Sequence, residues 1–181
     1  MPTRLPRLAK QLRKAVKMAR EGRLTVIRER VDSTTALQNV ASMTDDVAVV
    51  VEGSVLYPYI AFTARCAVPT MIGKKEITVD CLVDGVNGHG ATADSFSTEQ
   101  MVACDEVRLQ SKITDGEARR TAQRTVTHRL GKKLKLIAPF DVQLEAAGTV
   151  YKRFWIIRIG DGRIMADSVT GNMHPLSASA A

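Results

Sequence analysis

Two aspartates, Asp84 and Asp167, begin a short motif that occurs twice in the chain. It reads Asp-Gly-Val-Asn-Gly at residues 84–88 and Asp-Ser-Val-Thr-Gly at residues 167–171. Two carboxyl groups held together could divide acid and base catalysis between them. An aspartate before a turn also accepts hydrogen bonds from its own loop, and a following glycine supplies a positive φ. We therefore predict turn-structural roles for these residues and assign no catalytic residue: Asp84, Gly88, Asp167, Gly171.

The histidines and cysteines give no metal-binding pattern. His89, His128 and His174 have no Cys, Asp or Glu at the spacing of metal ligands. An odd total of three cysteines argues against a disulfide framework. We expect Cys66 and Cys81 to lie opposite each other on neighbouring strands as small core residues, with a disulfide or half of a zinc site as the alternatives. No metal and no cofactor are predicted.

Basic residues at the N-terminus give the clearest functional signal. Residues 1–30 hold ten Lys and Arg and two Glu, so the other residues sum to about −1 of the net charge of +7. Between Pro6 and Gly22, apolar residues at helical spacing form one stripe of a predicted basic amphipathic helix. Its other faces carry the candidate polyanion-binding residues Arg7, Lys10, Arg13, Lys14, Lys17 and Arg20. The alternative is that the stripe covers the protein's own sheet and the charges are only solvated.

A second basic cluster falls on a helix predicted from Thr114 to about Gly131. Thr114 and Glu117 form a capping box, which marks the start of the helix. Apolar residues follow at intervals of four, and Arg120 and Arg124 are added to the polyanion-binding candidates.

An internal repeat sets the expected architecture. Residues 46–47 and 53–56 align without a gap with residues 141–142 and 148–151, an offset of 95. Aromatic residues also match, and we expect them to pack in the core rather than to stack on bases: Tyr57, Tyr59, Phe154, Trp155.

The predicted fold class is α+β, with two related units that each pack a helix on an antiparallel sheet of about three strands. A basic helix and strand (1–31) precede the first, β-rich repeat (46–90) and the second, α/β repeat (114–175), and the three could form one continuous domain. In the first repeat, strands at 47–51 and 55–68 are separated by a turn, and a two-residue turn at Gly73-Lys74 follows. In the second, strands are expected at 142–145, 150–159 and 163–167.

This order of elements, ending in an apolar strand and Asp-x-Val-x-Gly, resembles the PepSY family and its relatives. The resemblance covers residues 114–175 best; it is looser over 46–90, where the hairpin is 12 residues longer. It implies a non-enzymatic module, often associated with peptidase inhibition or with envelope proteins. The chain differs in lacking an export signal.

The charge distribution favours an acidic partner. Residues 36–113 hold ten acidic and five basic residues, so opposite charges could also drive formation of a homo-oligomer. We expect a non-catalytic, cytoplasmic binding or assembly protein that docks on a polyanion, either nucleic acid or an anionic protein surface. An anionic membrane is less favoured, since the helix lacks aromatic anchors. The alternatives are an enzyme or small-ligand binder with a pocket between the repeats, and a PepSY-like inhibitory or regulatory module or membrane-surface accessory protein.

Overall fold

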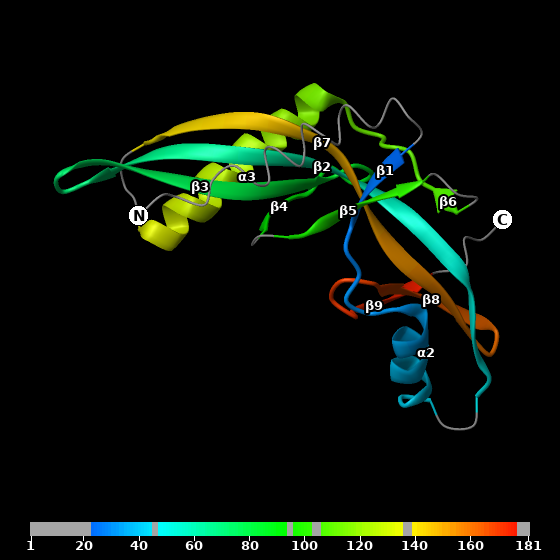
Figure 1. Ribbon diagram of the computed structural model, residues 1–181. Coiled ribbons are helices and arrows are strands. Elements are labelled where there is room, and N and C mark those ends of the chain that lie inside the picture. Colours follow the sequence, from blue (N-terminus) through cyan, green and yellow to red (C-terminus); the bar gives the residue numbers. More distant parts are fainter. Residues whose placement is uncertain (1–22, 45–46, 94–95, 103–105, 136–138, 177–181) are drawn as a thin grey trace.

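Two long strands form the centre of the protein in the computed structural model (Figure 1). The structure describes residues 23–44, 47–93, 96–102, 106–135 and 139–176. Within them, β2 (Val49–Thr70) pairs antiparallel with β7 (Asp141–Ile159) along most of its length. The other elements are β1 (Arg23–Ile27), α2 (Ser33–Ala41), β3 (Gly73–Asp84), β4 (Gly90–Ala93), β5 (Thr98–Val102), β6 (Val107–Arg108), α3 (Asp115–Leu134), β8 (Gly162–Asp167) and β9 (Met173–Leu176).

The strands of the described residues form one mixed sheet of nine strands. Its main path runs β4-β3-β2-β7-β1-β5, while β6 pairs with β2, and β8 lies between β7 and β9. The contacts of β1 with β7 and of β6 with β2 are parallel, and the other pairs are antiparallel. The predicted α+β fold, with two units that each pack a helix on about three antiparallel strands, is therefore wrong.

The prediction failed because β-bulges lie where two strands were each expected to end, at the predicted turn 52–54 and between residues 145 and 150. One shift in the register of β2 against β7 leaves Glu52 as an extra residue, and a second leaves Ala147 as an extra residue in β7. A bulge bends and twists a strand without ending it. The strands predicted at 47–51 and 55–68 are consequently the single strand β2, and those at 142–145 and 150–159 are the single strand β7.

The central strand pair has a local two-fold relation. The two bulges are 95 residues apart, the same offset as in the aligned segments. Tyr57 lies opposite Lys152, which is the residue 95 positions later, so this pair marks the position of the axis. The parallel contact of β6 with β2 has its counterpart in the contact of β1 with β7. The two repeats therefore share one sheet, and each contributes one strand to the central pair of β2 and β7.

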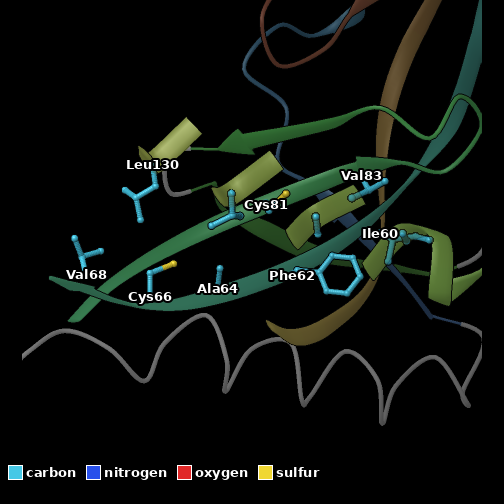
Figure 2. Close-up of a cluster of buried hydrophobic side chains, with 11 residues drawn as sticks. Ile60, Phe62, Ala64, Cys66, Val68, Cys81, Val83 and Leu130 are labelled. Carbon is cyan, nitrogen blue, oxygen red and sulfur yellow. The ribbon is translucent and has the colours of Figure 1, made fainter. Parts of the chain in front are cut away.

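Helix α3 covers one half of this sheet (Figure 1). Its predicted apolar stripe is completely or almost completely buried, which confirms the helix: Ala118, Ala122, Val126, Leu130. Figure 2 shows the side chains that β2 and β3 contribute to the same cluster: Ile60, Phe62, Ala64, Cys66, Val68, Cys81, Val83. Since α3 comes from the second repeat and this hairpin from the first, the repeats cannot form separate cores.

Helix α2 covers the other half of the sheet and was not predicted. The Asp32 carboxylate caps it by accepting a hydrogen bond of 2.7 Å from the Thr35 N–H. Its buried residues Ala36 and Val40 pack in a cluster with Ile157 of β7. Here a helix that precedes the first repeat packs on a strand of the second.

The β2–β3 hairpin has a different register from the predicted one. Its loop is Met71–Ile72 rather than Gly73–Lys74, so Cys66 lies opposite Ile77 and not opposite Cys81. The difference in register is an even number of residues, so each side chain keeps its predicted face of the sheet. The apolar positions of both strands therefore still meet α3.

Strand β1 is the strand predicted within residues 1–31, and it ends at Ile27. The predicted basic helix at the N-terminus lies outside the described residues. No helix in the described part of the chain is long and apolar enough to cross a membrane.

Candidate functional site

Helix α3 holds a row of basic side chains on a rigid support. The predicted capping box is present: the Thr114 hydroxyl accepts from the Glu117 N–H at 3.3 Å, and the Glu117 carboxylate accepts from the Thr114 N–H at 2.8 Å. This backbone hydrogen bond lowers the pKa of Glu117. The last turn carries Lys132 and Lys133, which suits the negative end of the helix dipole.

Arg120 and Arg124 occupy the face of α3 that points away from the sheet. They are one turn apart, and both are exposed. Together with Gln123, Thr127 and His128 they line a shallow depression of about 480 Å³. A depression with two guanidinium groups and further hydrogen-bonding side chains is suited to a phosphate or carboxylate group.

More basic residues follow towards the C-terminal end of the helix, where Arg129 and Lys133 line a cavity beside β3. We call the basic face of α3 the exposed set Arg120, Arg124, Arg129, Lys132, Lys133 and Lys135. Within the described residues, no member of this set forms a salt bridge, although the charge of Arg120 helps to lower the pKa of Glu117. Arg119 is not in the set, because it donates a hydrogen bond of 3.1 Å to the Leu144 carbonyl.

Six of the predicted polyanion-binding residues belong to the predicted N-terminal helix. They lie outside the described residues: Arg7, Lys10, Arg13, Lys14, Lys17, Arg20. Of the eight predicted polyanion-binding residues, the structure brings together Arg120 and Arg124.

Asp84 and Asp167 each hold a turn by the same contacts. Oδ1 of Asp84 accepts from the backbone N–H groups two and three residues later, at 2.8 and 2.9 Å. Oδ1 of Asp167 does the same at 2.8 and 3.2 Å. Gly88 and Gly171 take φ of 71° and 74°, a conformation that disfavours residues with a Cβ.

Both aspartates also contact the residues on the local two-fold axis, which the sequence analysis missed. The Tyr57 hydroxyl donates to Asp84 at 2.9 Å to Oδ1, with Oδ2 at 3.1 Å. The Lys152 ammonium pairs with Asp167 Oδ2 at 2.5 Å, and these two side chains are only 17% and 5% exposed. The offset of 95 residues relates Tyr57 to Lys152, so the repeat itself carried the signal for this cluster.

We call Tyr57, Asp84, Lys152 and Asp167 the axis cluster. Its surroundings shift the pKa values of several groups. Burial raises the pKa of Asp167, but hydrogen bonds from Lys152 and from the Val169 N–H outweigh it, so the pKa lies below its ordinary value. Burial and the neighbouring Asp84 raise the pKa of Tyr57, and burial raises that of Tyr59 to about 12. At neutral pH the tyrosines are therefore protonated and Asp167 is ionised. These contacts hold the two turns against the central strand pair.

A second buried polar group involves Arg153, which is 15% exposed. Its Nη1 pairs with Glu29, while Nε and Nη2 lie 2.9 Å from the two carboxylate oxygens of Glu106. The Ser54 hydroxyl donates to Glu106 at 2.5 Å, and the guanidinium lies over the Trp155 ring at 5.4 Å. This network joins β7 to the segments beside β1 and β6.

The remaining reactive side chains are dispersed. No group of three or more His, Cys, Asp or Glu in the described residues is arranged to hold a metal ion. His128 lies beside the arginines of α3, whereas His89 and His174 belong to different turns and strands. Cys66 and Cys81 are free, buried thiols. Burial raises the pKa of both, that of Cys81 to about 11, so neither is an activated nucleophile.

Comparisons with known proteins give no identification: no protein-family model, no curated protein and no solved structure matches the chain. The function is therefore inferred from the residues and geometry described above.

Proposed function

We propose that the protein is a non-catalytic binding or assembly protein that docks on a polyanionic partner through its basic helices, with nucleic acid as the specific partner. The observation that carries the proposal is the basic face of α3, whose six cationic side chains have no salt bridge within the described residues. Unpaired, exposed cations on a rigid element can neutralise phosphates without giving up existing ion pairs.

The support beneath the basic face favours this role. Four buried side chains fix α3 on the sheet, so the guanidinium groups of Arg120 and Arg124 are held at a defined spacing. The surface offers charge and hydrogen bonds, but α3 has no Phe, Tyr or Trp for base stacking. We therefore expect contacts with the phosphate backbone and affinity that varies little with sequence.

The N-terminal basic residues are part of the same proposal. Arg7, Lys10, Arg13, Lys14, Lys17 and Arg20 carry six more positive charges. The protein thus has two basic segments, residues 7–20 and α3.

The test compares the full-length protein with a variant in which these six basic residues are all changed to Gln. Each protein should be titrated with duplex DNA, single-stranded RNA and anionic liposomes over a series of salt concentrations. The wild type is expected to bind nucleic acid with an affinity that falls steeply with salt, and the variant is expected to bind more weakly with a smaller slope.

Binding to liposomes but not to DNA or RNA would indicate that the partner is an anionic membrane surface and not nucleic acid. Failure of the wild type to bind any of the three at low salt would reject the polyanion proposal and favour a protein partner.

A further inference from the structure

The outer edge of β3 is open along seven residues. Strand β4 pairs with β3 from Asp80 to Val83, and no strand of the described residues pairs with the outer edge of Gly73–Val79. Figure 1 shows β3 continuing well beyond the end of β4. In the other half of the sheet, β9 pairs with β8 over four of its six residues. The longer hairpin of the first repeat has therefore created a free strand edge.

The position of a proline shows which backbone groups point outward. Pro69 lies opposite Lys74 and has no N–H, so this pair cannot exchange both hydrogen bonds of the ladder. Hydrogen-bonded and non-hydrogen-bonded pairs alternate in an antiparallel ladder. The N–H and C=O groups of Lys74, Glu76 and Thr78 therefore point away from β2 and are available to another strand.

A cavity of about 410 Å³ lies beside this edge, between β3 and the C-terminal half of α3. Its apolar part is lined by Ile77, Val79, Leu130 and Leu134, and its polar part includes Arg129 and Lys133. Since a strand added to β3 would direct alternate side chains towards α3, the cavity is placed to receive them. The two basic residues select for a carboxylate on the same face.

We propose that the edge of β3 between Gly73 and Val79 is a docking site for an extended peptide segment of a partner protein, with apolar and acidic side chains on one face. The peptide adds a strand to the sheet by main-chain hydrogen bonds, and the cavity beside α3 provides the specificity. This site uses the strand edge, whereas Arg120 and Arg124 line the depression on the outer face of α3. The two proposed sites share Arg129 and Lys133 of the basic face.

A second copy of the chain fits the edge less well. Antiparallel self-pairing centred on Lys75 or on Glu76 places like charges directly opposite each other. The lysines and the glutamate on the edge are typical of strands that resist self-association.

The probe is a labelled, end-blocked peptide with the sequence Thr-Val-Thr-Glu-Thr-Val-Thr, titrated against the full chain by fluorescence anisotropy. Thr78→Pro removes an outward N–H and is expected to weaken binding at least about tenfold, while the thermal unfolding midpoint changes little. Lys75→Pro is the matched control, because its N–H bonds to β2 and its loss should destabilise the hairpin itself. Arg129→Gln with Lys133→Gln should weaken binding of the glutamate peptide and leave a version with Gln in place of Glu unchanged.

Peptide binding that Thr78→Pro leaves intact would overturn the proposal. Two peptides N-methylated at the odd or at the even residues that both bind as well as the unmethylated peptide would also overturn it. Absence of binding by the wild-type chain would also overturn it. If the wild type forms dimers in sedimentation and Thr78→Pro is a monomer, the edge binds a second copy of the chain and not a partner peptide. None of these results depends on nucleic-acid binding.

Discussion

The ion pair on the two-fold axis gives a direct test of the structural account. Replacing Asp167 by Asn keeps the shape of the side chain and an oxygen that accepts from the turn, but leaves the ammonium of Lys152 buried without its partner. Removing one member of a buried pair costs roughly 3–5 kcal/mol. The equivalent change, Asp84→Asn, leaves the neutral Tyr57 hydroxyl as the partner and should cost only about 1 kcal/mol.

The free energy of unfolding of both variants should be measured by urea denaturation with circular dichroism. The double variant Asp167→Asn with Lys152→Met removes the charge left behind and should recover much of the loss. Similar losses for Asp167→Asn and Asp84→Asn, or no recovery in the double variant, would refute the reasoning.

The same pair predicts the dependence of stability on pH. Because the pKa of Asp167 is lower in the folded protein than in the unfolded chain, the unfolded chain takes up the proton first. The stabilisation is therefore complete at pH values above the unfolded pKa of about 4 and is lost as the pH falls through the folded pKa. As the pH is lowered from about 5 to about 1, the wild type should lose more stability than Asp167→Asn.

Three further predictions concern the core beneath α3. Val126→Ala, at a fully buried position, should lower the free energy of unfolding by about 2 kcal/mol in a urea titration. In Gly90→Ala the new Cβ would lie 2.3 Å from the Thr125 hydroxyl oxygen, so we expect a lower melting temperature that Thr125→Ala partly restores; an unchanged temperature would contradict the close approach of β4 to α3. Cys66 and Cys81 should react with a thiol reagent only when the protein unfolds, as peptide mapping can show, and rapid labelling of either in the native state would argue against its burial.

Local patterns in the sequence were sufficient to predict α3 and the faces of the first hairpin. The capping box at Thr114 and the apolar stripe from Ala118 to Leu130 are recognised from residues three or four positions apart in the sequence. The faces of β2 and β3 depend on alternation alone, which a register error of an even number of residues does not change.

The way in which the repeats combine could not be predicted from the same patterns. A glycine beside a polar residue, as at Glu52-Gly53, indicates a turn, but it also suits a β-bulge in a strand that continues. The choice depends on the partner strand, which in this protein comes from the other repeat. Helix α2 was missed for a related reason: it is short, and much of its stability comes from packing against Ile157, far away in the sequence.

The candidate site was predicted in part. Arg120 and Arg124 were chosen as cations on a predicted helix, and the structure places both at the depression on α3. The axis cluster was missed because Lys152 and Asp167 were considered separately, although the alignment of the repeats already related Lys152 to Tyr57.

The salt dependence of duplex-DNA binding by Arg120→Gln/Arg124→Gln tests the central claim most directly. Its matched control is Arg28→Gln/Arg65→Gln, which removes two exposed arginines (65% and 66%) from weak surface ion pairs elsewhere. If both α3 arginines contact phosphates, the slope of log K against log salt should become smaller in magnitude by about 1.8, and the control should keep the wild-type slope. Equal slopes for the two variants would contradict a specific role of the basic face of α3 in binding a polyanion.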